Sequence, residues 1–254
     1  MQTIHLKLEI IQMARALRQT GRVIGAGAGA VALLGLGYMG ITWYRYGTVA
    51  RNRRRDPLVD SFMPKYEVRE VHETKVAAPA ELTYAVAKEL DLQKSTIVRA
   101  IFTGRELLMG AEHSKRDNSA SFLAEVLDLG WRVLAEDPGH ELVVGAATQP
   151  WNANVEFRGI PSEEFAAFDE PGYAKIIFTL AADSAGPNRS VFHTETRVLT
   201  TDPESRQKFR LYWSVFSPGI LLIRYEMLRL VKNEAERRVA LQHHSEEQLV
   251  GARE

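Results

Sequence analysis

The strongest constraint in this sequence is a run of 22 residues without a charged side chain, from position 23 to position 44. At 1.5 Å of rise per residue, a helix of this length measures about 33 Å, and the hydrocarbon core of a bilayer is roughly 30 Å thick. Arg22 and Arg45 bound the run. Trp43 and Tyr44 stand at its C-terminal end, and such aromatic rings favour the lipid headgroup level. The run therefore predicts a single transmembrane helix.

Two other interpretations of this run conflict with its residues. A cleaved signal peptide has its small residues after the apolar run, whereas here they come first and bulky aromatic residues follow. A dinucleotide-binding glycine loop needs a preceding strand and an acidic residue about 20 positions later, but apolar and then basic residues follow. Gly25 and Gly29 form a G-x-x-x-G pair, which lets two membrane helices pack closely. The pair predicts a homodimer formed through this helix. Alternatively, the two glycines are simply small residues in a glycine-rich span and have no role in packing.

Charge divides the chain at about residue 55. Residues 1–55 contain nine Lys or Arg and one Glu, a charge of +8, so the formal net charge of +0 leaves −8 for the rest. Arg53, Arg54 and Arg55 follow the span, where they can bind anionic lipid headgroups or act only as a topology signal. Five arginines after the span against four basic residues before it predict a single-pass protein of the cell membrane with its C-terminal domain in the cytoplasm. An acidic domain also argues against nucleic acid as a partner.

The rest of the pattern predicts one compact domain. We expect a basic N-terminal segment over 1–22, the span over 23–44, a basic linker over 45–63, the domain over 64–240 and a charged tail over 241–254. Within the domain, residues 66–78, 131–136, 141–148, 174–182 and 190–200 are typical of strands, and 80–92 and 95–108 of helices. A last helix is expected from Pro203 to about Arg237, with Asp202 as its N-cap and a kink or break at Pro218-Gly219.

Several segments between residues 66 and 237 form a recognisable pattern: Glu73–Pro79, Val133–Gly145, Glu164–Ala174, Thr194–Arg197, and Phe209–Trp213 followed by Pro218–Arg224. Together they resemble the START-like, polyketide-cyclase-like helix-grip superfamily. The resemblance is to a bacterial branch of mostly uncharacterised proteins. It implies an α+β fold in which a curved antiparallel β-sheet wraps around a long C-terminal α-helix, with a cavity between them for an apolar ligand. It does not imply an enzyme, because the superfamily mixes carriers, lipid binders and cyclases.

Two of the predicted strands carry ionisable residues that could reach such a cavity. His193, Glu195 and Arg197 share one face of the 190–200 strand, because side chains alternate with period two. They predict either a solvated outer face or a polar cavity cluster in which Glu195 and Arg197 pair. His72 lies on a partly apolar face of the first strand. It is the better candidate to meet the polar end of a ligand, although a hydrogen-bonded core histidine also fits.

Apolar residues recur at helical spacing after Pro203. Tyr212, Trp213 and Phe216, together with Trp151, are most simply core residues. In a helix-grip fold the concave side of the last helix also lines the cavity, so these core residues and the cavity wall would be the same. We therefore expect any ligand to bind between the sheet and this helix.

Several classes of function are excluded or disfavoured. The chain has no cysteine, which excludes disulfides, Cys-ligated metals and cysteine nucleophiles. It has no HExxH, P-loop or G-x-S-x-G motif, so the sequence predicts no cofactor and no metal. The favoured function is a membrane-anchored protein, in contact with membrane lipids, that binds an apolar small molecule or lipid. The alternatives are a cyclase or aromatase-like enzyme that uses His72, His193 or Glu195 as acid or base, and a non-catalytic subunit of a membrane complex.

Overall fold

The computed structural model describes residues 33–48, 56–110 and 121–251 and divides the chain into two compact units, residues 1–45 and 46–254. In the first unit, residues 33–45 form a helix with exposed leucines, such as Leu34 at 75%. No helix within the described ranges combines the length and hydropathy needed to cross a bilayer. The first part of the predicted span, residues 23–32, lies outside those ranges. So do Arg22, Gly25, Gly29, Arg53, Arg54 and Arg55.

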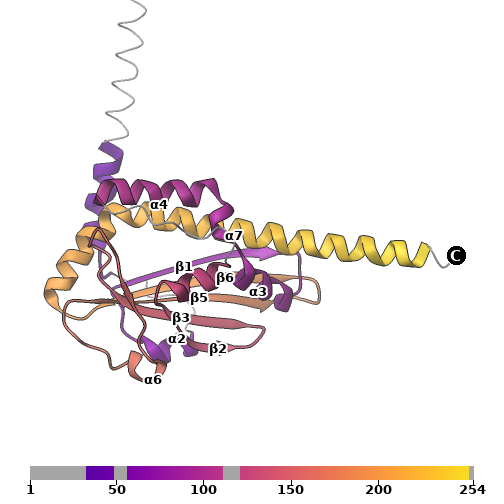
Figure 1. The fold of residues 1–254 in the computed structure, drawn as a ribbon, viewed down its shortest axis with the longest axis horizontal. Coiled ribbons are helices and arrows are strands. Elements are labelled where there is room, and N and C mark those ends of the chain that lie inside the picture. The colour runs from indigo at the N-terminus through magenta and orange to yellow at the C-terminus, as the bar shows by residue number, and fades with distance from the viewer. Residues whose placement is uncertain (1–32, 49–55, 111–120, 252–254) are drawn as a thin grey trace, which may run out of the picture. The chain divides into compact units, whose positions relative to one another are not determined.

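An antiparallel sheet of six strands forms the centre of the second unit (Figure 1). The strand order is β1-β6-β5-β3-β2, and the short β4 pairs with β3. The strands are β1 (Val68–Val76), β2 (Arg132–Asp137), β3 (Glu141–Thr148), β4 (Phe157–Arg158), β5 (Ala174–Ser184) and β6 (Ser190–Thr200). The five predicted strands are confirmed, and β3 and β6 have the predicted bounds. Clear turn residues precede both strands, such as Gly139, whose φ of 82° suits the turn between β2 and β3.

Helices cover one face of the sheet, which we call the inner face. They are α3 (Ala80–Glu89), the 3-10 helix η1 (Leu92–Lys94), α4 (Thr96–Met109), α5 (Phe122–Asp128) and α7 (Pro203–Gly251). Figure 1 shows α4 running alongside α7 above the sheet. The two helices approach closely at Gly219, because a Cβ there would lie 3.1 Å from Cγ2 of Ile101.

The last helix begins as predicted but ends later. Oδ1 of Asp202 accepts hydrogen bonds from the backbone N–H groups of Glu204 and Ser205, both at 2.9 Å, so the predicted N-cap is confirmed. The helix continues through Pro218 to Gly251. The predicted break is therefore absent, although Figure 1 shows a bend in the N-terminal part of α7. The prediction of a charged tail over 241–254 is wrong for residues 241–251, because these residues continue α7.

The other face of the sheet, the outer face, is covered by α2 (Pro57–Phe62) and α6 (Ser162–Phe165). Residues 57–62 were predicted to belong to a linker over 45–63, but they form α2. Asp56 caps this helix by accepting from the N–H groups of Leu58 and Val59 at 3.0 and 3.2 Å. Val59 and Met63 are each 1% exposed and pack with Ile177 of β5. The sheet is thus buried on both sides.

The register assigns each strand residue to one face. The ring of His72 contacts the ring of Tyr225 on α7 at 5.0 Å, so His72 lies on the inner face. His72 pairs with Thr194, and directly paired residues of antiparallel strands share a face. Thr194 and Thr196 are therefore inner, whereas Glu195 and Arg197 are outer.

Candidate functional site

The predicted site residues of β6 are on the side of the sheet away from α7. His193, Glu195 and Arg197 lie on the outer face, so they cannot meet a ligand held between the sheet and α7. They are not a solvated face either, since the side chains of Glu195 and Arg197 are 5% and 1% exposed. The two predicted environments, a polar cavity cluster and a solvated outer face, are both wrong for Glu195 and Arg197. The reason is that α2, which forms within the predicted linker, covers this face.

These residues form an ionic cluster beneath α2. Nε of Arg197 donates to Oε1 of Glu195 at 2.6 Å, and its Nη1 donates to Oδ1 of Asp60 at 2.6 Å and to the Met63 carbonyl at 2.7 Å. Arg69 on β1 donates to both carboxylate oxygens of Glu195, at 2.6 and 2.7 Å. Each buried charge therefore has a partner, which such a cluster needs for stability. The predicted pair between Glu195 and Arg197 exists, but its geometry fastens α2 to the sheet.

A buried carboxyl group adjoins this cluster. Glu141 on β3 is 5% exposed, and its Oε1 has no hydrogen-bond partner in the described part of the chain. Burial raises the pKa of Glu141 to about 8, and the carboxyl of Asp56, with which Glu141 shares a hydrogen bond, adds to the shift. Glu141 is therefore a protonated acid at neutral pH, and its proton can serve the hydrogen bond to Asp56.

On the inner face, the structure brings the predicted aromatic wall together. Trp151, from the loop between β3 and β4, and Tyr212 pack against the cluster that contains Trp213. The rings of Tyr212 and Phe216 stack with centroids 5.0 Å apart. Trp213 is 7% exposed and belongs to the core, whereas Trp151, Tyr212 and Phe216 keep accessible surface. The predicted packing of these aromatic residues is present, and their role as the wall of a ligand cavity stays a prediction.

Three side chains on the inner side of the sheet are partly exposed. Ile176 lies on the inner face of the central strand β5, where all other residues from Ala174 to Ala182 are buried. Burial raises the pKa of Tyr212 and lowers the pKa of Arg224 to about 10, yet both side chains remain partly accessible. Ile176 and Tyr212 pack against the cluster that contains Trp213, and Arg224 lies over the Phe178 ring. All three are therefore partly exposed residues at the contact between the inner face and α7.

Arg224 is a site residue that the sequence analysis missed. It lies on α7, and its guanidinium carbon is 5.2 Å from the centre of the Phe178 ring on β5. Its helical spacing from Ile220 and Met227 would have placed it on the sheet-facing side of the helix. The sequence did give an indication of this position, because Arg224 is an arginine among apolar residues at helical spacing.

His72 is the one predicted polar site residue on the inner face. It is 9% exposed, and the edge contact with Tyr225 fixes its ring. This arrangement fits the core histidine that the sequence also allowed.

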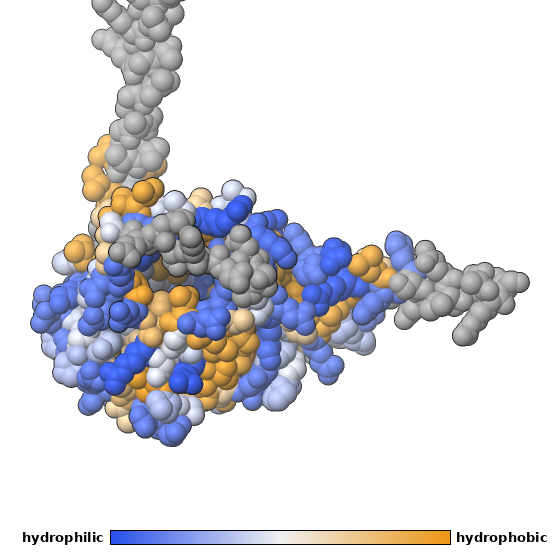
Figure 2. All heavy atoms as spheres, viewed as in Figure 1, coloured by the Kyte–Doolittle hydropathy of each residue, from blue (hydrophilic) through white to orange (hydrophobic). Residues whose placement is uncertain are grey.

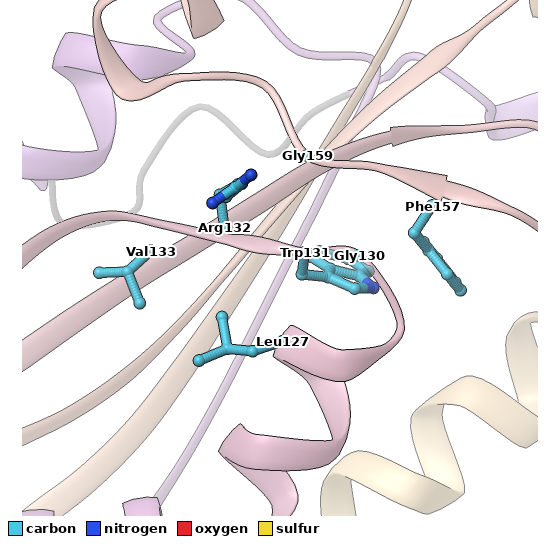
Figure 3. A pocket seen from close by; sticks show the side chains of 7 residues that line it. All are labelled: Leu127, Gly130, Trp131, Arg132, Val133, Phe157 and Gly159. Carbon is cyan, nitrogen blue, oxygen red and sulfur yellow. The ribbon is translucent and has the colours of Figure 1, made fainter.

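A surface pocket of about 610 Å³ lies at the edge of the sheet (Figure 3). It is lined by Leu127, Gly130, Trp131, Arg132, Val133, Phe157 and Gly159, none of which was predicted. Figure 3 shows Trp131 and Phe157 beside each other, and their ring centres are 5.1 Å apart. Hydrophobic side chains gather on this part of the surface in Figure 2, around β2. The ring of Trp131 also contacts the ring of Phe178, with centres 5.2 Å apart. Trp131 therefore contacts both the pocket and Phe178, the residue over which Arg224 lies.

Two further features concern metals and membranes. Within the described ranges, no group of three or more His, Asp or Glu side chains could hold a metal ion. In the helix over 33–45, Trp43 and Tyr44 are 47% and 80% exposed, and Arg45 is exposed as well.

Comparisons with known proteins give matches among solved structures alone. No protein-family model and no curated protein matches the chain. The aromatase/cyclase di-domain BexL from the BE-7585A biosynthetic pathway is 14% identical with a TM-score of 0.32, over 65% of this chain and 45% of that chain. This chain therefore spans about half the length of BexL.

Two further solved structures are similar. Truncated norcoclaurine synthase from Thalictrum flavum is 15% identical with a TM-score of 0.30, over 66% of this chain and 95% of that one. The ZhuI aromatase/cyclase from Streptomyces sp. R1128 is 16% identical with a TM-score of 0.23, over 68% and 95%. The antiparallel sheet and long C-terminal helix of this chain agree with the α+β architecture that the sequence predicts.

Proposed function

We propose that this protein binds an apolar small molecule or lipid between the inner face of its sheet and α7. The observation that carries the proposal is the set of partly exposed apolar and aromatic side chains where the sheet meets α7, among them Ile176, Tyr212 and Phe216. Their surroundings are mostly aliphatic and aromatic, as is common in ligand pockets.

Binding fits the inner face better than catalysis does. Of the three residues considered as acid or base, His193 and Glu195 lie on the outer face, and Glu195 is held by two arginines. His72 alone is inner, and it packs against Tyr225.

We further propose that the N-terminal segment anchors the protein in the cell membrane, with the domain in the cytoplasm. The helix over 33–45 supports this, because Leu33, Leu34, Leu36 and Ile41 are each more than 60% exposed. Exposed leucine and isoleucine side chains on one helix favour a lipid environment. A ligand that partitions into the bilayer would then be close to its binding protein.

The experiment is mass spectrometry of organic extracts from the full-length protein, purified from its membranes after carbonate washing. We expect the protein to stay with the membranes and to carry a recurrent apolar compound. Phe216→Arg should remove the compound, because this side chain borders the interior and stacks on Tyr212.

Val215→Arg is the matched control. Val215 is the preceding residue of α7 and is 38% exposed, so the same charge there faces solvent. Equal recovery of the compound from the parent and from both variants would contradict the proposed site. Release of the parent protein by carbonate would contradict the anchor.

A further inference from the structure

Arg224 occupies an apolar position of α7. Trp213, Ile220 and Met227 precede and follow it at spacings of 11, four and three residues, which place all four on one side of the helix. Trp213 and Met227 are buried at 7% and 1% exposure, so this side faces the sheet. The side chain of Arg224 is only partly exposed at this position, so its guanidinium loses part of its hydration, a cost that apolar residues do not have.

The charge of Arg224 has no counterion in the described part of the chain. Its contact there is with the face of the Phe178 ring, which is 2% exposed. Burial lowers the pKa of Arg224, and no carboxylate of the described residues offsets the effect. The outer face shows the contrast, since buried Arg197 is paired with both Glu195 and Asp60. Buried charges in proteins are normally paired.

A second polar group on the same face also lacks a partner. Oγ1 of Thr194 is buried and has no hydrogen bond with the described residues. Thr194 is two residues from Thr196, which pairs directly with Phe178. Its hydroxyl is therefore on the same face of the sheet as the Phe178 ring, over which Arg224 lies. Neither polar group has an acceptor within residues 33–48, 56–110 and 121–251, which leaves that role open to a ligand.

We propose that the ligand of this protein carries an anionic oxygen group, a carboxylate or a phosphate, which binds the guanidinium of Arg224 and the hydroxyl of Thr194. This inference rests on the proposed binding function and specifies its ligand class. The remainder of the ligand is apolar and contacts the wall of Tyr212, Phe216 and Trp151.

The chemistry of arginine favours this ligand class. The planar guanidinium presents paired N–H groups that match the two oxygens of a carboxylate or phosphate. An anion would neutralise the charge that burial disfavours, so binding and charge compensation would occur together. A neutral apolar ligand would leave both donors unsatisfied.

The test uses the full-length protein in phosphatidylcholine nanodiscs and a photoactivatable palmitic acid. Cross-linked peptides are identified by mass spectrometry, and labelling is competed with palmitic acid, methyl palmitate or hexadecyl phosphate. We expect labelling of peptides from α7 or β5, and competition by the acid at least about tenfold stronger than by its methyl ester. The phosphate competitor distinguishes the two possible anionic groups.

Variants connect this preference to the two donors. Arg224→Met should abolish the difference between acid and ester, Arg224→Lys should retain part of it, and Thr194→Val should reduce it. Arg237→Met is the control, because Arg237 lies on the same helix with a side chain that is 59% exposed. Thermal melts establish that each variant is folded, and Arg224→Lys keeps the test valid if Arg224→Met fails to fold.

The outcomes separate the inference from the proposed function. Interior labelling that acid and ester compete equally, in the parent and in Arg224→Met, would overturn the anionic ligand and leave apolar binding intact. Absence of labelling from α7 and β5 in the parent would overturn both.

Discussion

Replacement of Glu141 by glutamine should make the stability of the protein less dependent on pH. Burial raises the pKa of Glu141 from 4.5 to about 8 in the folded protein, and Asp56 contributes to the shift. The folded state therefore binds this proton more tightly than the unfolded state. The resulting stabilisation is complete below about pH 4.5 and is lost as the pH rises through about 8.

The magnitude follows from the shift. A difference of about 3.5 pKa units corresponds to at most about 5 kcal/mol of unfolding free energy. Sharing of the proton with Asp56 and residual solvent screening reduce this, and we expect about 2 kcal/mol. Glutamine has nearly the same volume, does not titrate and can still donate a hydrogen bond to Asp56.

The assay is urea unfolding of the parent and Glu141→Gln in nonionic detergent, followed by tryptophan fluorescence at about pH 5 and about pH 9. We expect similar stability at the lower pH and a variant that is about 2 kcal/mol more stable at the higher pH. Other titrating groups are common to both proteins and cancel in the difference. Glu164→Gln, on an exposed residue of α6, should show no such dependence. An identical difference at both pH values would refute the buried protonated state of Glu141.

Three further substitutions test the rest of the fold. Arg197→Met should lower the unfolding free energy by about 3 kcal/mol, because it leaves the Asp60 carboxylate without its partner beneath α2; urea unfolding measures this. Gly145→Val should cost about 1–3 kcal/mol in the same assay, since a Cβ there would lie 2.6 Å from Leu134 and 2.8 Å from Phe165. Asp202→Ala should lower the melting temperature by removing the cap of α7, and Asp202→Ser should restore part of it, as measured by circular dichroism.

Strong local patterns made most of the fold predictable. β3 is a short apolar run and β6 alternates between polar and apolar residues, both follow turn residues, and α7 begins at a capping residue followed by proline. The short α2 was missed because its six residues follow a basic segment and are too few to show helical periodicity. The end of α7 was missed because its charged residues are as typical of an irregular tail as of a helix.

The candidate site was predictable on the helix and unpredictable on the strands. Tyr212, Trp213 and Phe216 follow from helical spacing alone. The environment of Glu195 and Arg197 depends on which element covers each face of β6, and that information lies in α2, about 135 residues earlier in the sequence. Arg224 could have been recognised as a charge within an apolar stripe, but its lack of a counterion depends on the tertiary structure.

The alternation of β6 between two chemically different surroundings has a consequence for sequence change. Phe192, Thr194 and Val198 belong with the helices, while Glu195 and Arg197 belong with the ions beneath α2. Deleting a single residue from the middle of this strand would exchange the two faces for part of it. A carboxylate and a guanidinium would then point into the apolar interior, and a phenyl or isopropyl group would point toward the ions beneath α2. Substitutions can be absorbed one at a time, but insertions and deletions cannot. We therefore expect length variation among natural relatives to be confined to the loops at either end of this strand.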